Sequence, residues 1–359
     1  MFRSVSGMPL VKASILMNIG VAVFEALGSP RVEAEIVASS LVEADLAGVH
    51  SHGVMRIPYY VEHVREGLIK PAARIEIVRE TPTTAIVDGG GGFGQVAARR
   101  ASEIAVSKAE FSAISAVAAV NTGHIGRLGE YTLYIAERGM VGLGFCTTYR
   151  ASVAPYGGRG RRLSTAPISV AAPSDKFPFL LDYATSIVAE GKLRLKYLSH
   201  ESTPEAWIVD SQGRLSMNPS DFYERDGALL PFGGYKGYAL AMAVEILSGI
   251  LVGAGFPCSG CYKGMNSLLL IALDPSAFVG RSGFRDGVSS FIEAMKSTPP
   301  AEGFVEVLVP GEPEYRSREE KLRIGIPVED EVWARIKKTV VELGLDFDKL
   351  LSGSQQGLG

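Results

Sequence analysis

The fold is decided by residues 84–120, which read TAIVDGGGGFGQVAARRASEIAVSKAEFSAISAVAAV. Residues 85–88 predict a short β-strand, and a run of glycines follows them. Residues 95–111 predict a helix, and residues 114–120 predict a second strand. This strand–helix–strand order indicates an α/β fold.

The segments on either side extend this pattern. Further strands are predicted at residues 141–147, 168–172 and 268–273, with helices at 184–197 and after Gly237. The chain begins differently, because residues 31–46 and 58–65 predict helices, and residues 328–345 return to helical spacing near the end. We therefore expect an α/β domain attached to a helical domain.

The composition is that of an ordinary soluble protein. The chain has 359 residues, 47% hydrophobic and 21% charged, with a formal charge of −3. This length allows two domains, and the balanced charge gives no reason to expect nucleic acid or a membrane surface as a partner. No signal peptide is recognised at the N-terminus. Residues 238–256 are the most apolar long stretch, but they contain Glu245 and are interpreted as a buried or interface helix.

The cysteines indicate a reducing compartment, and we expect a cytoplasmic protein. Cys146, Cys258 and Cys261 are too few for a disulfide framework. Cys258 and Cys261 form a lone C-x-x-C, whereas a closed zinc site needs four ligands. We interpret the pair as ordinary cysteines and expect no metal.

Gly89, Gly91 and Gly94 match the G-x-G-x-x-G fingerprint of a Rossmann dinucleotide site, after a strand and before a helix. That fingerprint also needs an acidic residue at the end of the second strand, where this chain has Val120 and Asn121. A run of four glycines also matches the pattern easily by chance. We favour a tight, close-packed turn, with a Rossmann site as the alternative.

Residues 49–56, VHSHGVMR, hold two of the five histidines. His52 can exchange a proton near neutral pH, and Arg56 can bind a carboxylate through two hydrogen bonds. If the backbone between them is helical, the four-residue spacing places both side chains on one face. This pair suits chemistry on a small oxo- or hydroxy-acid. The alternative is a capped surface helix with Ser51 as N-cap and both side chains in solvent.

Three further segments combine polar groups with glycines. His124 follows the strand at 114–120, where α/β proteins place ligands, and is either a catalytic group or a packed histidine. Residues 182–186 are interpreted as a capped helix start whose hydroxyls also suit a ribose or phosphate. Residues 230–238, LPFGGYKGY, suit a phosphate or nicotinamide contact. A turn or a helix cap is the alternative for each segment.

Taken in order, these segments resemble the type 2 malate/L-lactate dehydrogenase family of NAD(P)-dependent oxidoreductases. The resemblance rests on ADLxGVxSHG at 44–53, GHIGRxGEY at 123–131, APYGG at 154–158, LDxATS at 181–186, GK at 191–192, GGYKG at 233–237, PGE at 310–312 and GIP at 325–327. Each motif is weak alone, and the ordered set is specific.

The resemblance implies an α/β nucleotide-binding domain that is not a Rossmann fold, and a helical domain formed by both chain ends. The corresponding division is 1–78 for the N-terminal helical part, 79–315 for the NAD(P)-binding domain and 316–359 for the returning C-terminal part. The family also implies a homodimer, NAD or NADP as the cofactor, and a small-molecule carboxylate as the substrate.

The family motifs also assign roles to residues. His52 is similar to the group that donates or accepts the proton of the substrate oxygen, with Ser51 supporting it, and Arg56 is similar to the clamp for the substrate carboxylate. His124 is similar to a second active-site histidine that some members use as the acid/base instead. Lys192 is a further catalytic candidate, and Thr165 matches a substrate-contacting threonine. The residues that match cofactor contacts are His124, Ile125, Gly126, Thr148, Asp182, Tyr183, Ala184, Tyr235, Lys236, Gly311 and Glu312.

The chain departs from the family near the expected pocket. It has STAP at 164–167 where the family usually has GTNP, PEAW at 204–207 in place of PEGW, and Ser267 in place of a histidine. These changes affect the choice of substrate more than the reaction class. Cyclic-imine reductases of the family tend to carry Asp where this chain has Lys192, which favours a 2-hydroxy acid over an imine.

The leading hypothesis is therefore an NAD(P)-dependent dehydrogenase of a malate- or lactate-like 2-hydroxy acid, with imine reduction as the alternative within the family. In a different class, His50, His52 and His124 would gather a divalent metal for a lyase or hydrolase, although no carboxylate partner is evident. A catalytically silent homologue is a third reading. NAD and NADP both stay open, since Arg159, Arg161 and Arg162 contact either a 2′-phosphate or solvent.

Overall fold

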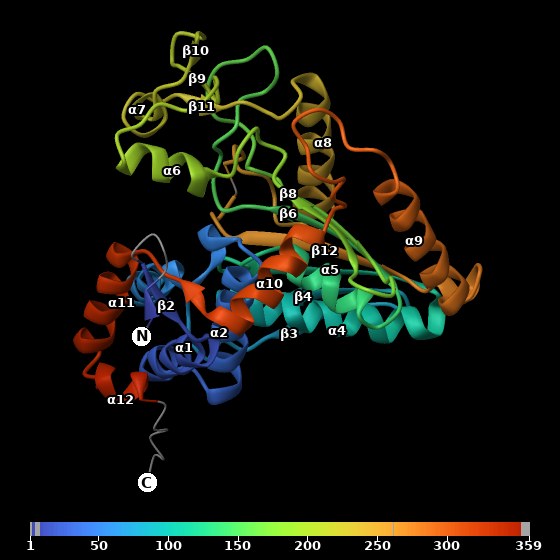
Figure 1. The fold of residues 1–359 in the computed structure, drawn as a ribbon, viewed down its shortest axis with the longest axis horizontal. Helices are drawn as coiled ribbons and strands as arrows, with labels where there is room; N and C mark the ends of the chain where they lie inside the picture. Colours follow the sequence, from blue (N-terminus) through green and yellow to red (C-terminus); the bar gives the residue numbers. More distant parts are fainter. Residues whose placement is uncertain (1, 4–7, 261, 353–359) are drawn as a thin grey trace.

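The computed structural model describes residues 2–3, 8–260 and 262–352. Its centre is a seven-stranded sheet in the order β3-β4-β5-β12-β6-β7-β8 (Figure 1). The strands are β3 (Glu76–Glu80), β4 (Thr84–Asp88), β5 (Ile114–Thr122), β6 (Val141–Thr147), β7 (Ile168–Ala172), β8 (Phe179–Tyr183) and β12 (Asn266–Leu273). The five strands predicted from the sequence are all confirmed, and β3 and β8 are additional.

The strand–helix–strand unit at 84–120 is present as predicted, because β4 and β5 pair in parallel. The other five ladders between described strands of this sheet are antiparallel. A doubly wound dinucleotide-binding sheet is mostly parallel, so the topology here is different.

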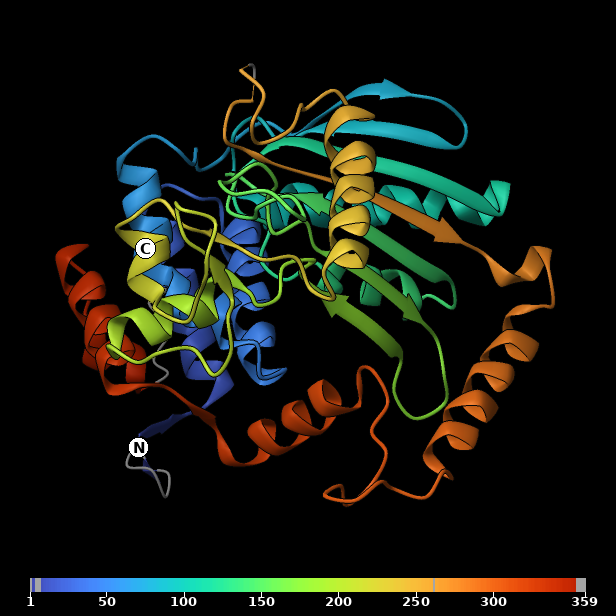
Figure 2. The ribbon, with the colours of Figure 1, turned by 90° about the horizontal axis from the view of Figure 1, so that it is seen from above.

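Helices cover both faces of the sheet. Helices α4 (Gly94–Ser112) and α5 (Gly129–Ala136) pack on one face, while α8 (Tyr235–Glu245) and the π-helical turn η3 (Ile246–Ile250) lie across the other (Figure 2). Successive side chains of a strand point to opposite faces. Val117 and Ala119 therefore join the core beneath α4 and α5, whereas Ala118 joins the core that contains Ala241 of α8.

A separate hydrophobic core is built from both ends of the chain (Figure 1). Its elements are α1 (Ala13–Ala26), α2 (Arg31–Leu46), α3 (Ile57–Arg65), α11 (Asp330–Glu342), α12 (Phe347–Leu351) and the small sheet of β1 (Phe2–Arg3), β2 (Pro9–Val11) and β13 (Ile326–Pro327). Leu16 and Leu41 from the first helices are fully buried, as is Ile336 near the C-terminus. The division at 78/79 and 315/316 stays a prediction, and β3 and α10 (Glu312–Ile324) run across these two positions.

A third group of elements lies beyond the sheet (Figure 1). It comprises α6 (Glu190–Leu198), α7 (Pro219–Tyr223), β9 (Ile208–Val209), β10 (Leu215–Ser216) and β11 (Ala228–Leu229). The helix predicted at 184–197 begins only at Glu190. The interpretation of residues 182–186 as a helix start is wrong, because Asp182 pairs with Ser169 in the β7–β8 ladder.

The remaining helices lie towards the C-terminus and include α9 (Arg281–Lys296) and the short turn η4 (Pro275–Ala277). In the described ranges, no helix combines the length and apolar character needed to cross a membrane. Cys258 is exposed, and Cys261 of the C-x-x-C lies outside the described residues.

Candidate active site

The glycine run forms the close-packed turn that the sequence predicts. The N–H groups of Gly89 and Gly91 donate to the carbonyl oxygens of Val120 and Asn121. A Cβ on Gly94 would lie 2.3 Å from the carbonyl oxygen of Gly123, so only glycine fits there. Because these fingerprint N–H groups are already bonded to the protein, they are not free to bind a diphosphate.

The sheet gathers predicted site residues at one edge. β12 is antiparallel to both β5 and β6, so His124, which follows β5, and Thr148, which follows β6, lie at the same edge. β7 begins and β8 ends at this edge, since Ile168 pairs with Tyr183. Thr165 before β7 and Asp182 in β8 therefore join them. The topology alone brings together residues that are almost sixty positions apart.

The backbone between His52 and Arg56 is not one continuous helix, so the condition for placing both side chains on one helical face is not met. Two 3₁₀ turns, η1 (His50–His52) and η2 (Val54–Arg56), are separated by Gly53 in an extended conformation. The Asp45 carboxylate causes this break. It accepts the Val54 N–H at 2.7 Å and lies where a Cβ on Gly53 would be, 2.2 Å away.

The structure brings His52 and His124 together and turns His50 away. The rings of His52 and His124 stack with centroids 5.5 Å apart. His50 instead donates from Nδ1 to Asp45 Oδ1 at 2.7 Å, and its Nε2 lies 3.3 Å from Lys321 Nζ. Both stacked rings are partly buried, whereas His50 is exposed.

Hydrogen bonds fix the tautomer of His124. Its Nδ1 lies 3.3 Å from the N–H of Gly126, which can only donate, and 2.7 Å from the Tyr60 hydroxyl. Gln95 Nε2 donates to the same hydroxyl at 2.7 Å, so the Tyr60 proton points to His124. Nδ1 therefore accepts, and the neutral His124 ring carries its hydrogen on Nε2. His52 differs, because among the described residues the one hydrogen-bond partner of its Nδ1 is the Ser51 hydroxyl, at 2.9 Å.

The surroundings keep both rings neutral. Burial, followed by the charges of Arg56 and Arg127, lowers the pKa of His52 to about 3. Burial and then the Arg56 charge lower the pKa of His124 well below its usual value. A charged ring would have to be stabilised by an anion, so both histidines are neutral at pH 7.

Arg56 is oriented with its outer nitrogens free. Nε donates to the carbonyl oxygen of Ser51 at 2.7 Å, and the guanidinium lies 5.3 Å from the centre of the Tyr59 ring. Among the described residues, the two terminal nitrogens have no hydrogen-bond or ion-pair partner. They form the planar fork that binds a carboxylate.

Lys192 and Thr165 approach the same region from different elements. A Cβ on Gly191, beside Lys192 in α6, would lie 2.8 Å from Ser51 Cβ, and the Lys192 side chain is exposed. The Thr165 loop is held by Thr185, whose N–H donates to the Thr165 carbonyl oxygen at 2.9 Å.

The loop before α8 is attached to the end of β8. The Phe232 N–H donates to the carbonyl oxygen of Thr185 at 3.0 Å, and the rings of Phe232 and Tyr183 are in edge contact. Because of this contact, Tyr235 and Lys236 begin α8 close to the sheet edge. Ala184 lies between these two attachments, in the link that follows β8.

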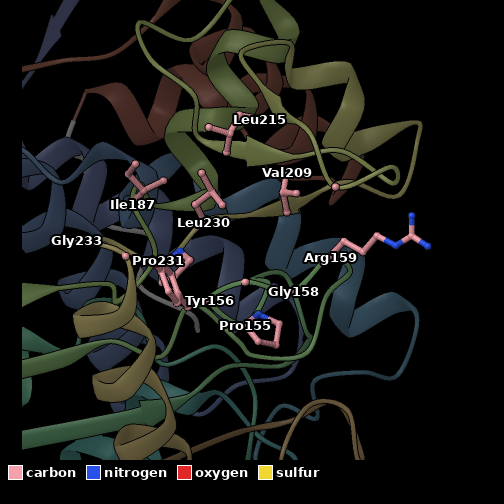
Figure 3. A pocket seen from close by; sticks show the side chains of 13 residues that line it. Pro155, Tyr156, Gly158, Arg159, Ile187, Val209, Leu215, Leu230, Pro231 and Gly233 are labelled. Carbon is pink, nitrogen blue, oxygen red and sulfur yellow. The ribbon is translucent and has the colours of Figure 1, made fainter.

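A cavity of about 640 Å³ borders the same loop (Figure 3). Its walls are mostly apolar, including Leu215 and Leu230, and Tyr156 separates it from Tyr235. Arg159 extends away from the other lining side chains in Figure 3, whereas Arg161 is bound to the carbonyl oxygens of Phe222 and Gly227. The stacked histidines do not line this cavity.

Asp182 is a partly buried carboxyl with a spare oxygen. Its Oδ2 accepts the Gly129 N–H at 2.9 Å, and Oδ1 has no hydrogen-bond partner among the described residues. Burial raises the pKa of Asp182 to about 6, against the Arg127 charge and the Gly129 hydrogen bond.

Gly311 and Glu312 lie near the beginning of β8, away from the end that carries Asp182. A Cβ on Gly311 would be 2.9 Å from the nitrogen of Leu180. The buried Glu312 carboxylate already binds Lys296, with both oxygens 2.7 Å from Nζ, and Arg316. Its carboxylate is thus committed within the protein.

The metal hypothesis has no cluster to support it. No group of three or more His, Cys, Asp or Glu side chains in the described part of the chain could hold a metal ion. His50, which that hypothesis requires, is bound to Asp45.

Sequence reasoning missed Asp45, Tyr60, Gln95 and Arg127. Asp45 belongs to the quoted motif at 44–53 without an assigned role, and Tyr60 follows Arg56 at helical spacing. Gln95 directly follows the glycine run and is fully buried. The available signal was position: Asp45 and Arg127 lie within quoted motifs, and Tyr60 and Gln95 lie close to recognised segments.

Comparison with known proteins identifies the family. The family model described as malate/L-lactate dehydrogenase matches residues 11–337. The L-sulfolactate dehydrogenase of Methanocaldococcus jannaschii is 37% identical over 334 residues, covering 91% of this chain and 95% of that protein. A solved structure of a putative malate/lactate dehydrogenase from E. coli has a TM-score of 0.89 at 33% identity, covering 97% of this chain and 99% of the other. The Δ1-piperideine-2-carboxylate reductase of Pseudomonas syringae has a TM-score of 0.82 at 26% identity, covering 92% and 99%. The chain belongs to the malate/L-lactate dehydrogenase family.

Proposed function

We propose that this enzyme transfers a hydride between NAD or NADP and a small 2-hydroxy or 2-oxo acid. The observation that carries the proposal is the stacked His52–His124 pair beside Arg56, whose outer nitrogens are unpaired. Such a reaction requires from the protein a group that exchanges a proton and, next to it, a guanidinium that binds the substrate carboxylate. The dehydrogenases among its relatives support the same reaction class.

The two histidines suit different tasks. In the oxidation direction, His52 accepts the proton of the substrate hydroxyl, with Ser51 orienting its ring through Nδ1. His124 donates a hydrogen bond from Nε2 to the same oxygen, because its Nδ1 is occupied by Tyr60 and Gly126. Arg56 holds the substrate carboxylate. In the reduction direction, His52 returns the proton.

The residues at the sheet edge fit a nicotinamide dinucleotide. The spare oxygen of Asp182 suits a ribose hydroxyl. The end of β8 carries Tyr183 and is followed by Ala184, and the start of α8 carries Tyr235 and Lys236. The bound cofactor supplies or takes the hydride. The protein side of the reaction is to orient both ligands and to move one proton.

The structural likeness to an imine reductase makes reduction of a cyclic imine the second candidate. The test is an absorbance assay of NADH and NADPH oxidation against a panel of 2-oxo acids and cyclic imines. We expect turnover of at least one 2-oxo acid. Turnover of imines alone would support the alternative, and activity that requires added metal would contradict both.

The Arg56 assignment has its own test. Arg56→Met keeps the length of the side chain and removes the fork, so the KM for the acid rises about 10- to 100-fold. The Kd of NADH, measured by fluorescence, stays within twofold. Unchanged KM would contradict the clamp.

A homodimer is also proposed. Exposed apolar side chains follow one another along α8 and η3, namely Tyr235, Met242, Ile246 and Ile250. Such a row favours a covered face. Light scattering of the purified chain tests this, and a monomeric mass would contradict it.

A further inference from the structure

Arg127 lies between the two halves of the proposed site. It is three residues after His124, which stacks on His52, and two residues before Gly129, whose N–H binds Asp182. Its carbonyl oxygen accepts the Glu130 N–H, which fixes its backbone at the start of α5. The arginine is thus placed between the acid/base pair and the carboxyl proposed to contact the cofactor.

The Arg127 side chain is buried without a partner. Only 9% of the residue is exposed, and its guanidinium makes no hydrogen bond or ion pair with any described residue. Two other partly buried arginines are paired within the protein: Arg161 binds two carbonyl oxygens, and Arg318 binds the Glu43 carboxylate. The guanidinium nitrogens are not among the fully buried side-chain atoms that lack a partner, so they are open to a ligand, and no described residue pairs with them.

The nearby carboxyls do not fill this need. Glu130 accepts the Ser40 hydroxyl at 2.5 Å, and Asp182 accepts the Gly129 N–H. Burial raises the pKa of Glu130 to about 7 and that of Asp182 to about 6, although the Arg127 charge opposes both shifts. A direct ion pair would lower these pKa values below their ordinary range.

Backbone donors extend the same site. Among the described residues, the N–H groups of Arg127 and Leu128 have no acceptor, and they immediately precede the eight-residue helix α5. Free N–H groups at the start of a helix attract an anion. The side chain of Arg127 and the backbone N–H groups of the same turn are therefore both without a partner among the described residues.

We infer that Arg127 binds an acidic oxygen group of a ligand in the active site. This inference rests on the proposed function, which supplies two sources of such a group. One is a second acid group on the substrate, at the end opposite the carboxylate on Arg56. The other is the diphosphate of the cofactor. Both match the guanidinium fork.

The test uses Arg127→Met, which keeps length and removes charge, and Arg127→Lys, which keeps charge but not the fork. Arg335→Met is the matched control, because Arg335 is exposed on α11. Calorimetry gives the Kd of NADH, NADPH and ADP without turnover. Steady-state kinetics give kcat/KM for oxaloacetate, which has two acid groups, and pyruvate, which has one.

If the substrate supplies the group, Arg127→Met lowers kcat/KM for oxaloacetate about 10- to 100-fold, with pyruvate and the nucleotide Kd values unchanged. If the cofactor supplies it, the Kd of NADH and ADP weakens by a similar factor and both acids are affected equally. Arg127→Lys recovers part of the loss in either case.

The inference is overturned if folded Arg127→Met keeps its nucleotide Kd values and its oxaloacetate-to-pyruvate ratio within twofold of wild type. If Arg127→Met does not fold, the same criterion applies to Arg127→Lys. Failure of the proposed function looks different, because the wild-type chain itself would then bind no nucleotide and reduce no acid.

Discussion

The two turns that carry His52 and His124 meet at one site but are held by different means. The His52 turn depends on side chains, since the Asp45 carboxylate binds His50 and the Val54 N–H. Lys321, from the far end of the chain, donates to the Asp45 carbonyl oxygen at 2.8 Å. The His124 turn depends on backbone contact with the glycine run, such as the Gly123 N–H donating to the Gly92 carbonyl oxygen.

Because of this difference, the two turns are sensitive to different kinds of substitution. One charged group governs the His52 turn, so a single polar substitution can displace it. The His124 turn leaves no room for an added methyl group, so it responds to volume instead. Each turn can therefore be disturbed by a change that the other would tolerate.

The largest expected effect separates the chemical roles of the rings. An amide can donate a hydrogen bond but cannot accept a catalytic proton, so His52→Gln lowers kcat about 10²- to 10⁴-fold. His124→Gln retains a donor and loses about tenfold. Steady-state kinetics at saturating cofactor measure both. Exposed His200→Asn is the control, and equal losses at the two active-site positions would contradict the division of roles.

The next effect tests the side-chain support of the His52 turn. Asp45 is only 4% exposed, and its two carboxylate oxygens accept hydrogen bonds from His50 and from the Val54 N–H. Asparagine has one acceptor oxygen and cannot replace both bonds, so Asp45→Asn lowers the free energy of unfolding by about 1.5–3 kcal/mol. Urea unfolding measures this loss, and kcat/KM falls with it. Asp348→Asn on the exposed face of α12 should stay within about 0.5 kcal/mol. Similar stability for both variants would show that Asp45 does not hold the turn.

The elements that depend on local sequence pattern were predicted well. Residues 31–46 form α2 with the predicted bounds, and strands β6 and β7 also match. β8 was missed because its sequence, FLLDY, is short and its Asp182 resembles a helix cap. Only the ladder to β7 makes it a strand, and pairing between separate segments leaves no local signature.

The site was predicted in part for the same reason. His52, Arg56 and His124 were identified from motifs, and the sheet brings their segments together. The condition set for His52 and Arg56, a helical backbone between them, is not met, because Asp45, several residues earlier, takes the space beside Gly53. Arg127 has no partner among the described residues because Glu130 binds Ser40 and Asp182 binds the Gly129 N–H. Residue spacing in the sequence does not reveal these pairings.

A smaller effect tests the packing of the His124 turn. In Gly94→Ala, the new methyl group meets the Gly123 carbonyl oxygen at 2.3 Å and must push the backbone aside. We expect a loss of about 1–3 kcal/mol in the free energy of unfolding. Gly287→Ala is the matched control: it lies in the exposed helix α9 with open space around its Cβ, and should gain about 0.5–1 kcal/mol. Loss at both positions would point to a general intolerance of alanine rather than to contact.

The smallest effect tests whether both rings stay neutral. The pKa of His52 is lowered to about 3 and that of His124 is lowered well below its usual value, so the folded protein resists protonation that the unfolded chain accepts below about pH 6.5. Stability is therefore full above that pH and declines as the pH falls, by at most about 1.4 kcal/mol per pH unit for each ring. Thermal unfolding from pH 7 to 5.5 should show a shallower decline for His52→Gln and for His124→Gln than for wild type, with His200→Asn unchanged. The double variant should flatten the profile by the sum of the two, because two rings that both stay neutral do not repel each other. If one single variant already removes the whole effect, the other ring is charged in the folded protein, and the two turns then differ in charge as well as in the way they are held.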